Sequence, residues 1–270
     1  MTKHGRRKFI FTSLGILGSG LLAAWIFKRR LVRQMLFTFS DNPTVSVTAS
    51  PLESEPCVLT TKQVEGPFYL PSPERSNIVD DKKGELLNLR IQVLTHPDCT
   101  PIPNAVVEIW QADAEGNYSG YPEQISQDEW EMFMLFGKNG EKQSNGEYHV
   151  KQVTQTTYLR GLQRTDENGW VFFDTIVPCW YIGRIPHIHF KVFVNNKEYI
   201  NSQLYFEKNY CDNLFTTKEP YTKMGKCPMD FPNDAVFAMA GGKHQGLLLL
   251  PHLTNDNKLS AIAKIGVMKI

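Results

Sequence analysis

Short apolar runs, separated by turn residues, follow one another along the chain from residue 87 onward. Each run covers six to nine residues, a length typical of β-strands. We predict strands at 87–95, 105–110, 158–165, 170–177, 187–194, 198–206 and 260–267. The Asn168-Gly169 pair suits positive φ angles and predicts a hairpin turn between two of them. The pattern favours an all-β fold, an antiparallel β-sandwich with long loops.

One segment departs from this pattern. Residues 119–148 form a long stretch in which large apolar side chains gather closely, namely Trp130, Met132, Phe133, Met134 and Phe136. We expect an insertion here that packs on the sandwich or covers part of it.

The first 35 residues have the layout of an export signal or membrane anchor, with an apolar helix between basic flanks. The run Arg6-Arg7-Lys8-Phe9-Ile10 resembles the twin-arginine signal of proteins that cross bacterial membranes already folded. A simple membrane anchor is the alternative, because the apolar run over 9–27 approaches the ~20 residues that span a bilayer. The sequence predicts export to the bacterial periplasm, or attachment to the membrane facing the periplasm if the segment is not cleaved.

The rest of the chain divides into a tether and a body. Residues 36–56 are rich in Ser, Thr and Pro, which is typical of a flexible tether. Residues 57–270 then form the predicted β-sandwich.

Composition adds one constraint, the distribution of charge. Apolar residues make up 41% of the chain and charged residues 21%, which excludes a disordered protein. The net charge is +1, but residues 1–33 hold eight Lys and Arg and no acid, so the remainder carries 21 basic and 28 acidic residues, a net −7. An acidic body argues against nucleic acid as a partner.

The candidate chemistry begins with a pair of histidines on a predicted strand. Side chains two residues apart share one face of a strand, so His187 and His189 point the same way. The alternate residues Ile188 and Phe190 then face the core. Two imidazoles on one face are potential metal ligands, although surface histidines are the ordinary alternative. A cupin-type site would need a Glu shortly downstream, and none is there.

Two tyrosines and an arginine lie close to these predicted strands. Tyr181 and Arg184 stand on the loop that leads into the histidine strand, and Tyr118 follows the polar turn after residue 110. Each has an ordinary alternative, since Tyr residues pack at strand ends and Arg184 could form an ion pair.

Taken together, the motifs at 65–69, 110–118, 160–166, 173–178, 181–189 and 202–206 resemble the intradiol ring-cleaving dioxygenases. These are the catechol and protocatechuate enzymes, which contain non-haem ferric iron. The resemblance covers about residues 57–270 with the motifs in the same order, and the chain is most similar to the short, exported subgroup.

The resemblance implies a four-ligand Fe(III) site made of Tyr118, Tyr181, His187 and His189. Anionic phenolate oxygens favour ferric iron, which is a hard cation, and the cation in turn favours loss of the Tyr proton. In the family, a catechol binds the iron through both oxygens, the tyrosinate matched by Tyr181 takes a substrate proton, and O2 opens the ring between the two hydroxylated carbons. The implied product is a muconate-type diacid.

The resemblance also assigns two further catalytic residues. Arg184 matches the arginine that stabilises negative charge on the substrate ring, and Gln203 matches a glutamine of the same pocket. The ordinary alternative for Gln203 is solvation of a strand face. A non-catalytic envelope β-sandwich that binds a ligand through a vestigial metal site is the rival function. The ring substituents and the oligomeric state stay open.

Five cysteines in an exported body leave at least one unpaired within the chain. We expect Cys211 to pair with Cys227 across a polar loop, and Cys57 to pair with Cys99. Cys179, which stands where the family usually has Gly, is then left as a thiol beside the metal.

Overall fold

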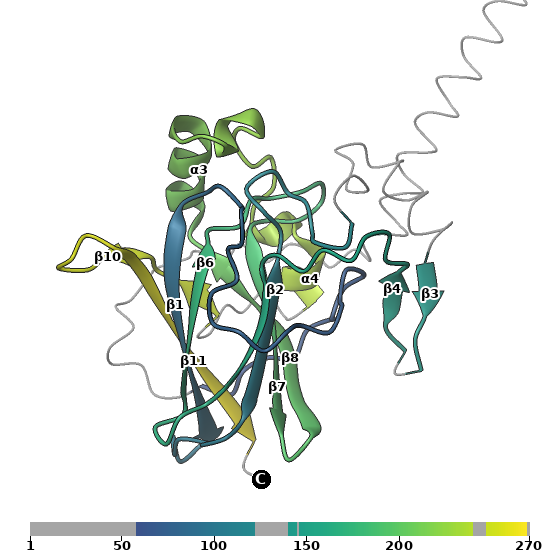
Figure 1. The fold of residues 1–270 in the computed structure, drawn as a ribbon, viewed down its shortest axis with the longest axis vertical. Helices are drawn as coiled ribbons and strands as arrows, with labels where there is room; N and C mark the ends of the chain where they lie inside the picture. The colour runs from purple at the N-terminus through teal and green to yellow at the C-terminus, as the bar shows by residue number, and fades with distance from the viewer. Residues whose placement is uncertain (1–57, 122–139, 145, 240–246, 269–270) are drawn as a thin grey trace, which may run out of the picture.

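The computed structural model describes residues 58–121, 140–144, 146–239 and 247–268. Two β-sheets pack into a sandwich-like body with few helices (Figure 1). The four-stranded sheet has the strand order β10 (His252–Leu253), β11 (Leu259–Met268), β1 (Leu86–His96), β6 (Trp170–Ile176). The five-stranded sheet has the order β5 (Arg160–Arg164), β2 (Val106–Gln111), β7 (His187–Val194), β8 (Lys197–Phe206), β9 (Leu248–Leu249). All seven predicted strands are present, with bounds shifted by one or two residues at most ends.

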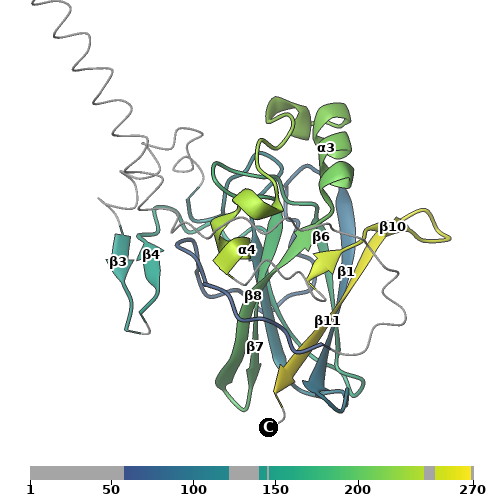
Figure 2. The ribbon, with the colours of Figure 1, turned by 180° about the vertical axis from the view of Figure 1, so that it is seen from behind.

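The prediction of purely antiparallel sheets is wrong. Strand β11 pairs with β1 in parallel over nine residue pairs, and β9 pairs with β8 in parallel. Parallel neighbours need a long crossover rather than a hairpin. The segment between β8 and β9 supplies one, because it leaves the sheet through helices before the chain returns (Figure 2).

The sandwich core follows from the period-two pattern of the strands. On β1 the alternate residues Leu87, Leu89, Ile91 and Val93 are buried between the sheets. Strand β7 differs, because seven of its eight residues are buried and only Phe193 is partly exposed. Its inner face packs in the core, so a further layer must cover its outer face.

That layer is the segment before β1. The Gln63 amide N–H donates to Asn201 O at 2.8 Å, and Ser202 Oγ donates to Thr61 O at 2.7 Å. Asn201 and Ser202 lie on β8, the strand next to β7. The segment around residues 60–68 therefore lies along the outer face of the five-stranded sheet, which creates a buried space for polar side chains there.

The helices were not predicted. Helix α3 (Lys208–Thr217) begins after Glu207, whose carboxylate accepts from the Asn209 and Tyr210 amides, and buries Leu214 and Phe215. The short elements η1 (Tyr221–Lys223), η2 (Phe231–Asn233) and α4 (Ala235–Met239) follow. None of the described helices has the length and apolarity needed to cross a membrane. The predicted export segment and tether lie outside the described residues.

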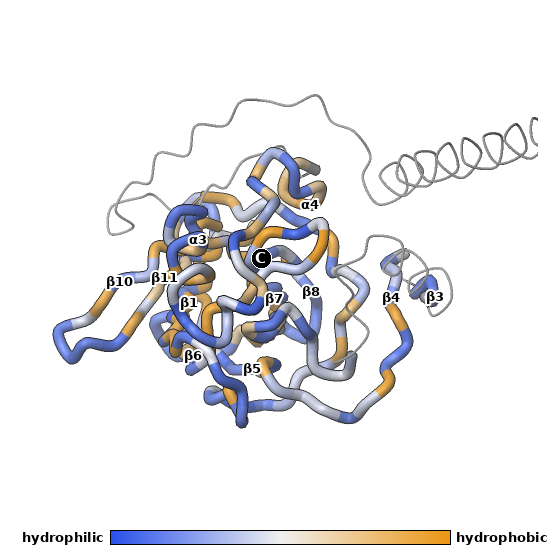
Figure 3. Tube along the Cα trace, turned by 90° about the horizontal axis from the view of Figure 1, so that it is seen from above, coloured by the Kyte–Doolittle hydropathy of each residue, from blue (hydrophilic) through white to orange (hydrophobic). Residues whose placement is uncertain are grey.

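The predicted insertion is described only at its two ends. Residues 122–139 lie outside the described part, and the hairpin of β3 (Gly140–Lys142) and β4 (Tyr148–Val150) stands to one side of the sandwich (Figures 1 and 2). The turn between β10 and β11 projects on the opposite side and is hydrophilic (Figure 3).

The cysteine prediction is wrong for one pair. Cys211 and Cys227 are both free and buried, and both belong to the apolar cluster of the sandwich core. Cys99 is disulfide-bonded, and its expected partner Cys57 lies outside the described residues. Cys179 is free as expected, but it belongs to the core cluster and not to the cluster that surrounds Tyr118 and Tyr181.

Candidate metal centre

The register of the five-stranded sheet sets out the candidate site. His189 on β7 lies between Trp110 on β2 and Gln203 on β8, and His187 lies opposite Tyr205. All five residues are buried on the outer face of the sheet. The indole of Trp110 stacks on the His189 ring with centroids 4.8 Å apart and planes 8° apart, which fixes the orientation of the imidazole.

Tyr118 reaches this face from a tight loop after β2. The Asp113 carboxylate accepts hydrogen bonds from the amides of Glu115 and Asn117, both at 2.9 Å, so the loop folds around one buried side chain. Gly116 has a φ of +81°, and a Cβ there would lie 2.8 Å from Trp180 O. Only glycine fits at that point, and the loop can then pack closely against the segment that carries the second tyrosine.

Tyr181 lies on the loop before β7, and a hydrogen bond joins the two loops. The Cys179 amide donates to Asp113 O at 3.1 Å. The Trp180 indole N–H donates to Gly225 O at 2.8 Å, which holds the same loop from its other side. The two tyrosines are thus positioned relative to each other before any ligand is bound.

The four predicted ligands converge on one point. Tyr118 Oη lies 3.2 Å from His187 Nε2 and 3.1 Å from His189 Nε2, and the two Nε2 atoms are 3.0 Å apart. Tyr181 Oη lies 3.5 Å from His187 Nε2. The structure thus brings together all four residues from two loops and one strand.

This arrangement fits a metal ion better than it fits internal hydrogen bonds. His187 Nδ1 lies 2.6 Å from Ile185 O, and a carbonyl can only accept, so Nδ1 carries the proton and Nε2 has a single lone pair. Three polar atoms surround that lone pair, which can accept only one hydrogen bond. Donor atoms bound to one ion at ~2.0–2.2 Å in tetrahedral directions lie roughly 3.3 Å apart, close to the separations here.

Burial keeps the four groups neutral without a cation. Desolvation raises the pKa of Tyr118 well above its usual value, and the neighbouring Tyr181 raises it further. Burial likewise raises the pKa of Tyr181 and lowers the pKa of His187 and His189 well below the usual value. Neutral imidazoles are ready to coordinate a metal, whereas each tyrosine must exchange its proton for the cation.

Tyrosine oxygens complete the candidate site. No group of three or more His, Cys, Asp and Glu side chains that could hold a metal occurs in the described part of the chain. The two histidines and the two phenolic oxygens are the candidate donor set, and such a set would favour a hard, oxygen-preferring cation that also accepts nitrogen.

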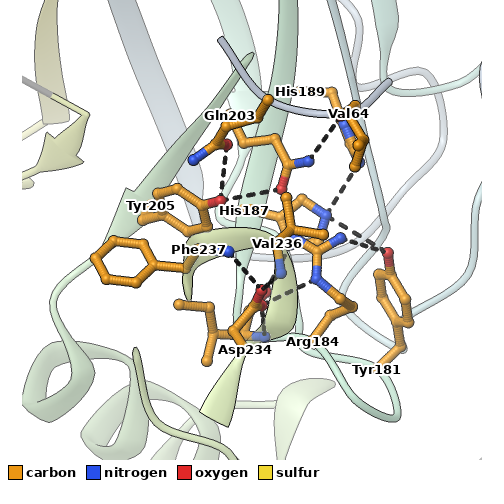
Figure 4. A network of polar contacts seen from close by, with 12 residues as sticks. Val64, Tyr181, Arg184, His187, His189, Gln203, Tyr205, Asp234, Val236 and Phe237 are labelled. Atoms are coloured by element: carbon orange, nitrogen blue, oxygen red, sulfur yellow. Dashed lines mark hydrogen bonds and ion pairs between the residues drawn. The ribbon is translucent and has the colours of Figure 1, made fainter. Parts of the chain in front are cut away.

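Arg184 is fixed beside the ligands by a carboxylate that the sequence did not reveal. Its Nε donates to Asp234 Oδ2 at 2.9 Å, and its Nη1 lies 3.4 Å from Tyr181 Oη (Figure 4). Burial by itself would lower the pKa of Arg184, but the Asp234 carboxylate raises it overall, so the guanidinium is charged. Arg184 thus lies beside Tyr181, and it also forms the ion pair that was its ordinary alternative.

Asp234 is fully buried and fully hydrogen-bonded. Its Oδ2 also accepts from the Ile185 amide at 3.0 Å, and its Oδ1 accepts from the amides of Val236 and Phe237. One side chain therefore connects the loop of Tyr181 and Arg184 with the first turn of α4. Asp234 lies fifty residues after Arg184 in a polar loop, and neither spacing nor periodicity marked it.

Gln203 belongs to the same hydrogen-bond network. Its side-chain oxygen accepts from Arg184 Nη2 and, at 3.3 Å, from Tyr205 Oη (Figure 4). Its side-chain nitrogen donates to Val64 O at 3.2 Å. Gln203 is thus buried beneath the covering segment and is not a solvated strand residue.

The covering segment walls the site with an aromatic ring and a glycine. The Phe68 ring stacks on Tyr118 with centroids 5.0 Å apart, and a Cβ on Gly66 would lie 3.2 Å from the His189 ring. The Gly66–Phe68 motif therefore forms a wall of the site. Together with Tyr121, these groups exclude water from the ligands.

The sandwich buries two tyrosines and two histidines together beside the outer face of one sheet. Residues 64–219 match the family model described as Dioxygenase. The chain belongs to the intradiol ring-cleavage dioxygenase family.

Solved structures agree with this membership. An intradiol ring-cleavage dioxygenase from Tetranychus urticae is 27% identical, with a TM-score of 0.66 over 78% of this chain and 95% of that one. The dioxygenase domain of a dioxygenase carbohydrate-binding protein fusion from Streptomyces sp. SirexAA-E shares the fold at 22% identity, with a TM-score of 0.50 over 79% of this chain and all of that domain. None of the curated proteins matches the chain.

Replacing Asp234 should show how far the site depends on it. Asp234→Ala leaves the Arg184 guanidinium buried without its carboxylate, so we expect the free energy of unfolding to fall by about 3–5 kcal/mol in urea titrations. Asp234→Asn keeps one of the two acceptor oxygens, which can accept two of the four hydrogen bonds, and should cost less. Asp256→Ala, which removes an exposed partner of Lys258, is the control and should leave stability unchanged. Equal effects of Asp234→Ala and the control would contradict this role.

Proposed function

We propose that the protein is a non-haem Fe(III) dioxygenase that opens a catechol-type ring between its two hydroxylated carbons with O2. The observation that carries the proposal is the convergence of Tyr118, Tyr181, His187 and His189, in which the polar atom of each lies 3.0–3.5 Å from that of at least one other. The similar protein from Tetranychus urticae, an intradiol ring-cleavage dioxygenase by name, supports it.

The choice of iron rests on charge and hardness. A bound ferric ion would hold the catechol oxygens and favour their deprotonated form. Two phenolates would offset two of its three positive charges, which suits a site that is closed to water. Neutral imidazoles at His187 and His189 complete the donor set without adding charge.

Tyr181 is suited to accept a proton from the substrate, and Arg184 is suited to stabilise negative charge on it. Tyr181 Oη is the more weakly engaged tyrosine oxygen, at 3.5 Å from His187 Nε2, and it is the proton acceptor for a substrate hydroxyl in this proposal. Arg184 stays charged and faces the same oxygen. Its guanidinium stabilises negative charge that develops on the substrate ring, and its fixed position avoids a reorganisation cost.

Gln203 keeps Arg184 in place and lines the same pocket. Its side-chain oxygen accepts a hydrogen bond from Arg184 Nη2, and its side-chain nitrogen donates one to Val64 O. The amide therefore sets the direction of the guanidinium in addition to its contact with the substrate in this proposal.

Tyr118→Phe and Tyr121→Phe form a matched pair that tests the proposal. Tyr121 is buried in the same cluster, but its hydroxyl donates to Val150 O and is no ligand. After loading with ferric iron, the wild type and Tyr121→Phe should be burgundy through tyrosinate-to-iron charge transfer and should convert catechol to a ring-opened diacid. Tyr118→Phe should lose iron, colour and at least 100-fold in activity, because removal of a ligand is a larger change than removal of a group that only orients one.

The assay has a clear contrary result. A wild type that takes up no iron and gains no colour would favour a non-catalytic binding module on the same scaffold. A Tyr118→Phe variant with full colour would remove Tyr118 from the ligand set.

Export through the twin-arginine route is a second part of the proposal. Its support is the Arg6-Arg7-Lys8-Phe9-Ile10 run. The disulfide at Cys99 suits an oxidising compartment but counts against folding before export, because it would not form in a reducing cytosol. Changing Arg6 and Arg7 together to Lys should leave active enzyme in the cytoplasm of the producing bacterium. Ring-cleavage assays on cell fractions check this, and normal envelope localisation of the double variant would rule the route out.

A further inference from the structure

Arg160 is a completely buried arginine without an acidic partner. It is the first residue of β5 and lies opposite Trp110, so it belongs to the same cross-strand row as His189 and Gln203. None of the ion pairs among the described residues includes it, and its Nη1 has no hydrogen-bond partner there. Burial lowers the pKa of Arg160 to about 10, so it is still charged at neutral pH.

A buried charge of this kind is costly unless hydrogen bonds compensate for it. The Arg160 guanidinium donates hydrogen bonds to three oxygen acceptors. Nε donates to Ser119 Oγ at 2.7 Å, and Nη2 donates to both Ser119 O and Phe68 O at 2.8 Å. Only the planar fork of arginine presents several donors in fixed directions at once, which a lysine cannot reproduce.

These acceptors lie on the two segments that meet at one ligand. Ser119 directly follows Tyr118, and Phe68 stacks on the Tyr118 ring with planes 23° apart. Phe68 also belongs to the segment in which Gly66 packs against His189. The three hydrogen bonds of Arg160 therefore fix the backbone of Tyr118 and the ring that covers it.

We infer that Arg160 is a positioning residue for the metal ligand Tyr118, acting as a clamp between Phe68 and Ser119. This role rests on the proposed function, because it takes Tyr118 as an iron ligand. Without the clamp, the Tyr118 ring can rotate or withdraw, and its oxygen is no longer held against the two imidazoles.

Two substitutions at Arg160 separate the clamp from charge and volume. Arg160→Met keeps a similar length without donors, and Arg160→Lys keeps the charge without the fork. We expect both variants to bind ferric iron at least tenfold more weakly than the wild type and to show a shifted or broadened charge-transfer band. A merely structural role would lower the melting temperature and leave the band of the bound iron unchanged.

Arg75→Met is the matched control. Arg75 donates to Arg160 O at 3.0 Å and to Thr157 O at 2.6 Å, so it supports the same end of β5 without touching the ligand segments. It should lower the melting temperature and keep the wild-type iron affinity and band. Should Arg160→Met fail to fold, Ser119→Ala removes one acceptor of the clamp and should shift the band in the same direction by a smaller amount.

The outcomes distinguish this inference from the proposed function. A coloured wild type whose iron affinity and band are reproduced by Arg160→Lys and Ser119→Ala would overturn the clamp alone. A wild type that binds iron without any tyrosinate band would overturn the proposed function, and the clamp with it.

Discussion

The site depends on one constraint, the burial of both faces of β7. Ile188 and Phe190 are fixed in the sandwich core, so the period of the strand directs His187 and His189 to the other face. Imidazoles can be buried there only because the segment before β1 covers them and excludes water. Once neutral and enclosed, the two Nε2 atoms form a rigid half-site 3.0 Å apart, and the tyrosines have only to reach it.

The other half of the site is built from loops, which hold a fixed conformation only when hydrogen bonds or packing contacts restrain them. The Asp113 carboxylate accepts hydrogen bonds that shape the loop of Tyr118. The backbone carbonyl of Asp113 accepts a hydrogen bond from the Cys179 amide, which lies on the loop of Tyr181. Asp234 fixes Arg184 from a third segment. The geometry of the folded site therefore comes from buried hydrogen bonds between distant parts of the chain. Leaving any one of these bonds unmade would cost free energy, because its buried polar groups would lack a partner. These supports explain how flexible connections can hold four donor atoms within a few ångströms.

Sequence patterns could predict the strands and the histidine pair, because both follow from a period of two. They could not supply Tyr118 and Tyr181 without the family resemblance, since a tyrosine after a turn has no distinctive spacing. Asp234 was missed because its partner lies fifty residues away and the contact exists only in three dimensions. The parallel pairing of β11 with β1 depends likewise on a long crossover, and the Cys211–Cys227 prediction failed because loop length says nothing of the burial of each thiol.

Resonance Raman spectroscopy of the iron-loaded protein, excited within its visible absorption band, tests the central claim most directly. Under these conditions only the vibrational bands of tyrosine bound to the metal gain intensity, so the spectrum identifies the tyrosine ligands directly. The account predicts tyrosinate ring vibrations in the wild type and the loss of one set of them in Tyr181→Phe, with the Tyr118 set retained. A spectrum without tyrosinate vibrations, from protein that holds one iron per chain, would show that the metal is bound elsewhere and would contradict the account.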